Sequence, residues 1–461
     1  MPILQKNEKR EFYSSFLRLA LPIIIQNLIS ASLYIVDTIM VGQLGEIPLA
    51  AVSQANQLSY ILQLFLFGMA SGAAVFGAQF WGARDIQGVN AAFTLATFFS
   101  VGISLPFLLA GTILPHTVLD LYTQDAEVAK LGAAYLFIVA LSYPLQAING
   151  TYSSILRSTG SVRLPMLAAI VSIIINTTCN YILIFGKFGV PALGIAGAAI
   201  ATSFACLCHT LVLVIGGRLY QDTLRFSLTA LRETGGKKFV GYYLRIAFPV
   251  LINDGVWGVG TSIYWIVYGQ MGTAVVAAMG IFGTVERILF VVGACAGSAC
   301  AVMVGQRIGE DSIAKAYDTG KLFLKISIAL GAGIGLCMLP FRQWIGPIYN
   351  VSEEVNAAIG GVMLVYCLTL GVRYFTFSCE LGCLRAGGDT TFVMILDLLG
   401  VWCVGLPAMA IGAIFFHLDI SWVYFLLTLD EIVRCIVSFF RFRSRRWINN
   451  LISSKKENVP S

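Results

Sequence analysis

Long apolar stretches separated by short polar segments make up most of this chain. The first two, Phe16–Val41 and Leu49–Gly77, each exceed the roughly 20 residues with which a helix crosses the hydrocarbon core of a bilayer. The pattern predicts an all-α polytopic membrane protein with twelve transmembrane helices and both chain ends on one side. The other ten predicted helices are Ala91–Pro115, Leu131–Tyr152, Leu164–Phe185, Ile195–Gly217, Ile246–Gly269, Val276–Gly305, Lys321–Pro340, Ala357–Leu381, Phe392–Phe416 and Ser421–Phe440.

Lysine and arginine are distributed unevenly between the two sides of these helices. Of the 30, 22 lie on the side of the chain ends, and only Lys130, Lys187 and Arg342 lie in the opposite loops. The positive-inside rule therefore predicts that both termini are cytoplasmic. The basic tail 441–461 is expected to contact membrane lipids as a stop-transfer segment and surface anchor, with a specific lipid site as the alternative.

The chain also contains an internal repeat. A shift of 227 residues aligns Pro22 with Pro249 and Gln79 with Gln306, and the register holds for about sixty residues. We therefore expect two homologous six-helix bundles, 1–217 and 246–440, joined by a cytoplasmic linker, 218–245. Because six is even, the halves share one orientation, so the predicted pseudo-two-fold axis runs along the membrane normal. Secondary transporters use this plan, with the substrate site between the halves.

Composition excludes several other classes of protein. The chain is 57% hydrophobic and 12% charged, whereas soluble domains are about 25% charged. A cytosolic enzyme or a protein with a nucleic-acid partner is therefore not expected. The three histidines are too scattered for a metal centre or a catalytic cluster, and the 11 cysteines, nearly all in apolar runs, read as reduced packing residues. We expect a monomer without enzymatic activity.

Four sequence motifs resemble those of a known protein family. They are Val-Asp37-Thr-x-Met-Val-Gly-x-Leu-Gly45, Leu156-Arg157-Ser-Thr-Gly160, Gly194-x-Ala-Gly-Ala-Ala-Ile-Ala-Thr202 and Leu384-Arg385-Ala-Gly-Gly-Asp389-Thr390. The chain resembles the MATE (multidrug and toxic compound extrusion) family over nearly its whole length. The resemblance implies a pair of bundles that alternates between outward-open and inward-open forms. It also implies export of amphipathic, often cationic organic compounds, driven by H⁺ or Na⁺ without ATP or another cofactor.

Alternative functions remain open at this stage. A dedicated metabolite exporter fits the same plan, as does a lipid-linked oligosaccharide flippase, although a flippase needs a basic groove for pyrophosphate. The charged residues inside the predicted helices are mainly acidic, which favours cationic cargo. A membrane enzyme would need clustered catalytic groups, and a channel or receptor would not require a repeat that encloses intramembrane carboxylates.

A coupling site is predicted in the first half. Asp37, Asn180 and Thr202 all lie about 7–11 Å below the outer ends of their helices at 1.5 Å per residue. Asn176 and Asn180 are four residues apart and share a helix face. Such oxygen ligands suit a proton or Na⁺, the one metal ion that we expect. The family resemblance assigns coupling to Asp37, Asn176 and Thr202, but Asn180 stands where the family has a second aspartate, so a two-carboxylate relay is in doubt.

A second acidic group is predicted in the other half. Intramembrane carboxylates are costly, so Asp254, Asp397 and Glu286 are candidates for attracting a cationic substrate. The alternative is a buried acid paired with a hydroxyl or an arginine, which for Glu286 would be the adjacent Arg287. The sodium-coupled branch of the family has acids where this chain has Trp257 and Tyr374, so that cation site is expected to be absent.

Two further sets of residues are candidates. The prolines Pro22 and Pro249 are expected either to kink their helices, which could couple ion binding to bundle geometry, or to lie near helix starts at the interface. Aromatic rings that could line a cavity for flat cations are Tyr34, Trp257, Tyr264 and Tyr374.

Overall fold

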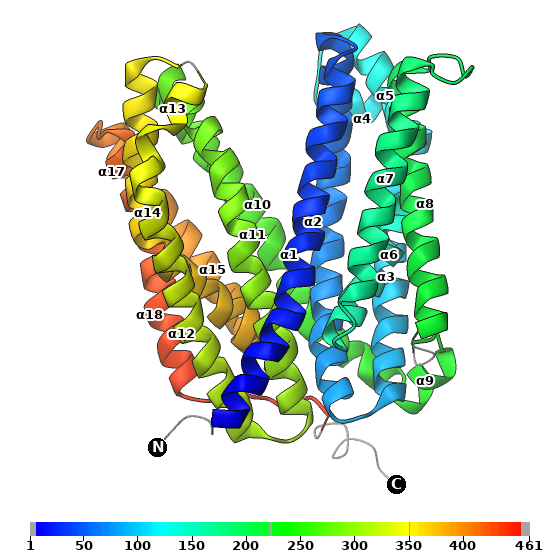
Figure 1. The fold of residues 1–461 in the computed structure, drawn as a ribbon, viewed down its shortest axis with the longest axis vertical. Helices are drawn as coiled ribbons and strands as arrows, with labels where there is room; N and C mark the ends of the chain where they lie inside the picture. Colours follow the sequence, from blue (N-terminus) through cyan, green and yellow to red (C-terminus); the bar gives the residue numbers. More distant parts are fainter. Residues whose placement is uncertain (1–5, 221–223, 350, 453–461) are drawn as a thin grey trace. The chain divides into compact units, whose positions relative to one another are not determined.

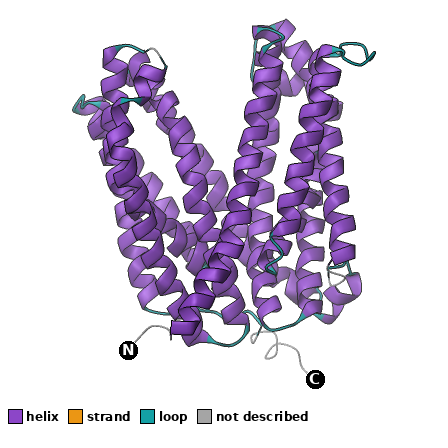
Figure 2. Ribbon diagram, viewed as in Figure 1, coloured by secondary structure: helices purple, strands orange, loops and turns teal. Residues whose placement is uncertain are grey.

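The computed structural model describes residues 6–220, 224–349 and 351–452. Helices make up nearly all of this part of the chain, and it contains no strand (Figures 1 and 2). In the first half the helices are α1 (Lys6–Gly42), α2 (Glu46–Gly82), α3 (Ile86–Ile113), α4 (Pro115–Asp120), α5 (Ala126–Ala140), α6 (Tyr143–Ser158), α7 (Arg163–Phe185) and α8 (Gly194–Tyr220).

The second half has more breaks within its helices. Its α-helices are α9 (Leu228–Glu233), α10 (Lys237–Met271), α11 (Thr273–Gly309), α12 (Ile313–Met338), α13 (Ile345–Ile348), α14 (Glu353–Phe377), α15 (Thr390–Leu399), α16 (Leu406–Ala410), α17 (Ile420–Leu427) and α18 (Leu429–Arg443). A 3₁₀ turn, η1 (Leu339–Gln343), follows α12. Three π-helical segments interrupt the later spans: η2 (Ser378–Leu384), η3 (Gly400–Gly405) and η4 (Ile411–Phe415).

Every predicted span coincides with helical structure. Among the described residues, ten helices are long and apolar enough to cross a membrane, and the bent pair α5–α6 makes eleven. The predicted twelfth span corresponds to α17 and α18, which divide at Thr428 and carry Asp430, Glu431 and Arg434. Its charged and broken character explains why it does not pass an apolar criterion, although it lies where the sequence predicts it.

The breaks have local causes. The α5–α6 span bends by 49° at Leu141–Ser142, and Pro144 occupies the first turn of α6. A proline is tolerated in a first turn but cannot continue the preceding helix, because it lacks an N–H group. In the eleventh span Pro407 occupies the first turn of α16, between η3 and η4. π-turns of this kind often accompany functional positions.

The chain divides into two compact units whose boundaries differ from the predicted domains. One unit is 21–251, and the other combines 1–20 with 252–461. Phe12 near the start of α1 packs against Phe323 of α12, with ring centroids 5.0 Å apart. In the first part of α10, the Tyr243 hydroxyl donates to the Met69 carbonyl of α2 at 2.9 Å. The predicted linker and the first half of α10 therefore belong to the unit of α2.

Each unit has an apolar core of its own. In the unit 21–251 the core joins α2, α5 and α8 around Leu62, Leu136 and Ala199. In the other unit Phe282, Tyr366 and Tyr424 stack edge to face, which joins α11, α14 and α17. These cores hold the helices that carry the polar side chains described below.

The segment after α18 folds back onto the loop between η2 and α15. Trp447 is fully buried and donates from its indole nitrogen to the Phe442 carbonyl at 2.9 Å. The Asn449 side chain donates to the Gly387 carbonyl at 3.0 Å. Arg441 binds Asp389 at 2.7 Å. Part of the predicted basic tail is thus a packed element of the protein.

Candidate functional site

The four residues of the predicted coupling site form one continuous hydrogen-bonded chain. Asn180 Nδ2 donates to Asp37 Oδ1 at 2.5 Å and to Asn176 Oδ1 at 3.0 Å. Asn176 Nδ2 donates in turn to Thr202 Oγ1 at 3.4 Å. These hydrogen bonds link α1 to α8 through α7. The structure thus brings together, as depth and spacing predict, side chains that are 26 to 143 residues apart.

Burial leaves one polar atom of these hydrogen-bonded residues without a partner. Asn176 and Asn180 are fully buried, and Asn180 Oδ1 accepts no hydrogen bond from the described residues. A buried acceptor without a donor is unfavourable by about 1–3 kcal/mol. Protonation of Asp37, or a cation bound beside it, would supply the partner that Asn180 Oδ1 lacks.

A small cavity lies against Asp37. Its volume is about 40 Å³, and its polar lining includes Ser53, Asn56, Tyr135 and Thr202. A cavity of roughly 10–15 Å³ already holds one water molecule, so this one has room for a small hydrated ion or water. Asn56 of α2 and Tyr135 of α5 line this cavity together with Thr202, so the polar lining extends to α2 and α5.

Sequence reasoning missed Asn56 and Tyr135. Asn56 lies seven residues after Leu49, the outer start of its predicted span, which is the depth that identified Thr202. The same depth argument could therefore have found it. Tyr135 gives no comparable signal, because tyrosines are common along the apolar stretches of this chain.

Asp37 has no basic partner within the described parts of the chain. None of the ion pairs found there includes it, its carboxylate accepts from the Asn180 amide, and it lines the cavity. An isolated carboxylate in a low-dielectric interior is strongly disfavoured unless it gains a proton or a cation. The site is therefore suited to bind one positive charge from the cavity.

The predicted acids of the second half have arginine partners instead. Asp254 lies 3.5 Å from Arg385, and Asp397 lies 3.0 Å from Arg434. Asp397 also accepts a 2.6 Å hydrogen bond from Asn253 Nδ2 on α10. The structure thus gives the predicted alternative, buried acids paired with arginine, and their expected role as free charges for a cationic substrate needs correction.

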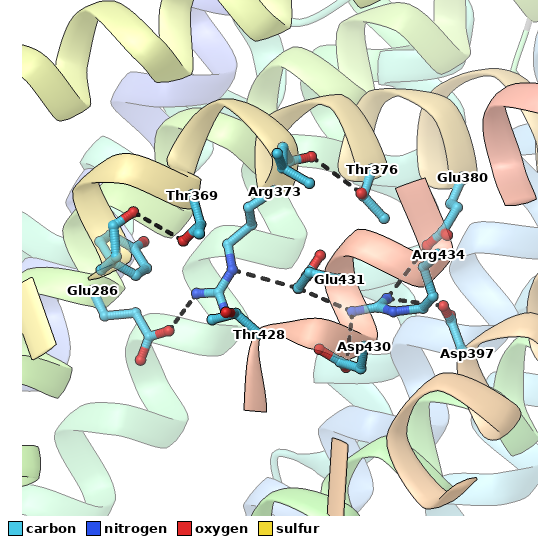
Figure 3. A network of polar contacts seen from close by, with 12 residues as sticks. Glu286, Thr369, Arg373, Thr376, Glu380, Asp397, Thr428, Asp430, Glu431 and Arg434 are labelled. Atoms are coloured by element: carbon cyan, nitrogen blue, oxygen red, sulfur yellow. Dashed lines mark hydrogen bonds and ion pairs between the residues drawn. The ribbon is translucent and has the colours of Figure 1, made fainter. Parts of the chain in front are cut away.

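Glu286 shows the same correction. Its carboxylate binds Arg373 of α14 at 2.6 Å, whereas the sequence suggested the adjacent Arg287 (Figure 3). Residues 286 and 287 point in different directions on one helix, because successive side chains are about 100° apart. Arg373 also contacts Glu431 at 3.4 Å, so one arginine links α11, α14 and α18.

The candidate aromatics separate into different environments. Tyr374 is fully buried and donates to the Leu289 carbonyl at 2.6 Å, which makes it a packing residue rather than part of a cavity wall. Tyr264 packs against the apolar core. Trp257 is 44% exposed and lines a narrow cleft with Asn253, Asp397 and Trp402. The side chain of Tyr34 lies outside the described residues.

Both candidate prolines lie inside long helices. Pro22 belongs to α1, which begins at Lys6, and Pro249 belongs to α10, which begins at Lys237. Neither lies at a helix start, so the alternative of a proline near a helix start does not hold. Each removes one main-chain hydrogen bond from its helix, which makes these the positions where α1 and α10 bend most readily.

Comparison with known proteins gives one consistent result. The family profile described as MatE matches residues 22–182 and 256–411. The chain is 27% identical to the uncharacterized transporter YisQ of Bacillus subtilis, over 91% of this chain and 92% of that protein. It is 24% identical to the probable multidrug resistance protein YoeA of the same organism, over 92% and 91%.

Solved structures agree in fold. The bent form of the Vibrio cholerae MATE transporter VcmN superimposes with a TM-score of 0.85 and 18% identity, covering 99% of this chain and 100% of that one. At this identity the likeness concerns the fold alone, an all-α multi-span membrane architecture.

Proposed function

Because this chain belongs to the MATE family of multidrug efflux transporters, we propose that it is a secondary active antiporter for amphipathic, cationic organic compounds. The antiporter exchanges them for H⁺ or Na⁺ by alternating access. It resides in a bacterial inner membrane with both termini in the cytoplasm, in line with the distribution of lysine and arginine.

One observation carries this proposal. Asp37 faces a cavity, has only an amide donor at hydrogen-bonding distance, and has no basic partner within the described residues. Its charge is therefore available to an ion that enters from the cavity. Binding of that ion changes the bond between α1 and α7, and α1 is the helix that Pro22 makes easy to bend.

Both candidate ions fit the donor set. A proton on Asp37 would turn the carboxyl group into a donor, and the unpartnered Oδ1 of Asn180 is the nearby acceptor once its amide rotates. Na⁺ would use oxygen ligands from Asp37, Asn180 and Thr202, the hard ligands that such ions prefer. The two cases differ in whether Na⁺ supports transport.

The charge distribution favours cationic cargo over a lipid-linked pyrophosphate. Three largely buried arginines of the second half, Arg373, Arg385 and Arg434, each bind at least one carboxylate. They are therefore not available as a basic lining for an anionic headgroup. This supports drug export over the flippase alternative, while a dedicated exporter of a cationic metabolite needs a substrate panel.

Everted membrane vesicles give the direct test. We expect them to accumulate ethidium or berberine under an imposed gradient, and Asp37→Asn to reduce accumulation to the level of empty vesicles, because the amide keeps size and hydrogen bonding but cannot bind a charge. Collapse by a protonophore identifies H⁺, and loss on replacement of Na⁺ by choline identifies Na⁺. Asp120→Asn, an exposed acid of α4, is the matched control. Normal export by Asp37→Asn would contradict the proposed site.

A further inference from the structure

A single arginine stands among four carboxylates in the second half of the chain. Arg434 of α18 is 3.0 Å from Asp397 and 2.9 Å from Glu431 (Figure 3). It is also 3.4 Å from Asp430 and 3.5 Å from Glu380. All five side chains are nearly buried, and they come from α15, η2 and α18.

The surrounding charges do not balance these acids. Glu431 also contacts Arg373, and that arginine already binds Glu286. Asp254 of α10, adjacent in sequence to Asn253, binds Arg385 at 3.5 Å. Among the described residues, three arginines thus serve six carboxyl groups. Because an unpaired buried carboxylate is costly, some of the six must be neutral or bind a further positive charge.

Geometry identifies where this neutral group lies. Arg434 Nη1 donates to Asp397 Oδ1 at 3.0 Å and to Glu380 Oε2 at 3.5 Å, so the two carboxyl groups meet at one nitrogen. Two buried carboxyl groups that share one site do not both stay ionised, because their like charges repel. Glu380 is 6% exposed, and no donor reaches its Oε1 within the described residues. The other titratable groups near Glu380 are the thiols of Cys379 and Cys435.

We propose that Glu380 and Asp397 share one exchangeable proton, so that the surroundings of Arg434 form a proton-binding site in the second half of the chain. The backbone supports this arrangement, because Glu380 lies in the π-helical turn η2 and meets Asp397 of α15 at the guanidinium of Arg434. Asp397 also lines a narrow cleft with Trp257 and Trp402, which are 44% and 37% exposed.

The proton is connected to α10. Asn253 Nδ2 donates to Asp397 Oδ2, and Arg434 binds Oδ1 of the same carboxylate. When Glu380 loses the shared proton, Asp397 must compete with a charged Glu380 for Arg434. The bond to Asn253 then changes, and with it the attachment of α10, the helix that contains Pro249.

Proton uptake by the purified full-length protein in detergent tests this directly, without any substrate. Between about pH 9 and about pH 5, above the range of ordinary carboxyl groups, we expect Glu380→Gln to take up about one proton fewer per chain than the wild type. The glutamine amide donates to Asp397 as the protonated glutamate does. Asp397→Asn should lose the same proton, and it carries the test if Glu380→Gln does not fold.

The double variant sharpens the result. Because one proton is shared, Glu380→Gln with Asp397→Asn should also lose about one proton, as each single variant does. A loss of two protons would show independent groups and overturn the proposal, and so would unchanged uptake in the single variants. Infrared difference spectra between the two pH values should show a protonated-carboxyl band that both single variants lack.

Two controls separate this site from the others. Glu310→Gln, an exposed acid paired with Arg307, should leave uptake in this window unchanged. Asp37→Asn reports the proposed coupling site of the first half, so its result is independent of Glu380 and separates a failure of the proposed function from a failure here. Measured on the Asp37→Asn protein, which lacks the ion site of the first half, uptake should be equal in sodium chloride and choline chloride. Proton release caused by Na⁺ would overturn the proposal in favour of a metal-ion site.

Discussion

The two halves of the chain make the same helix–helix bond with its partners exchanged. In the first half, Asp37 on α1 accepts from Asn180 on α7 at 2.5 Å. In the second half, Asp397 on α15 accepts from Asn253 on α10 at 2.6 Å. These are the first and fifth spans of each repeat, yet the acid lies on the first span in one half and on the fifth in the other.

The surroundings of the two acids differ more than the bonds themselves. Asp37 faces a cavity without a basic partner among the described residues, whereas Asp397 contacts Arg434 within a buried network. The first arrangement leaves a charge for an incoming ion, and the second neutralises the charge internally. An intramembrane acid therefore cannot be assigned to ion or substrate binding until its partners are known.

The largest effect is expected on removing the central arginine. Arg434→Met leaves four buried acids without their shared partner, and we expect a loss of about 3–5 kcal/mol in the free energy of unfolding. Thermal unfolding of the purified protein in detergent measures it. Arg307→Met, an exposed arginine in an ion pair, should change stability by less than about 1 kcal/mol. Equal effects would mean that the network contributes nothing specific.

A smaller loss is expected for Asp254→Asn. It leaves the nearly buried Arg385 without its ionic partner, which should cost about 1–3 kcal/mol of stability. Because that charge is already paired, binding of cationic and neutral amphiphiles of similar size should decrease equally. Ligand binding to the purified protein distinguishes the cases. A selective loss of cation binding would restore the substrate role that the sequence suggested.

The first half is tested by adding an acid. Asn180→Asp places a second carboxyl group within hydrogen-bonding distance of Asp37, so the pair must share a proton or bind a cation. We expect the pH dependence of dye export to shift and the rate at a fixed alkaline pH to change by on the order of tenfold, since 1.4 kcal/mol corresponds to that factor. An unchanged pH profile would separate Asn180 from coupling. Asn176→Asp tests whether the effect depends on direct contact.

The smallest effect is predicted at a candidate that the structure reassigns. Tyr374→Phe removes the hydrogen bond to the Leu289 carbonyl and should reduce stability by about 0.5–1.5 kcal/mol. Dye export should stay at the wild-type level, because the ring lies in the apolar core. A changed substrate range with unchanged stability would return Tyr374 to the substrate path.

The sequence predicts the spans well because membrane thickness fixes their length. It does not predict that α1 and α10 begin ten residues or so earlier, since their polar first turns carry no hydropathy signal. The π-turns are also missed, because η2 has no proline and depends on packing against α11. The family resemblance concerns the fold and its class of function, which the comparisons confirm.

The candidate site shows a similar division. Depth below a helix end was sufficient to predict that Asp37, Asn180 and Thr202 lie close together, and the four-residue spacing from Asn180 added Asn176. The partners of the second-half acids were not predictable in this way. Arg373 and Glu286 are 87 residues apart, and only the packing of α11 against α14 brings them together.

The composition of the two compact units has a consequence for biosynthesis. The unit 21–251 is continuous, so all of its residues have left the ribosome when the chain is little more than half made. The other unit needs Phe12 from the beginning of the chain and Trp447 and Asn449 from near its end. Since domains tend to fold in the order of their synthesis, the N-terminal segment must wait for its partners. The first part of α1, up to Ala20, is therefore available to chaperones or the insertion machinery throughout translation.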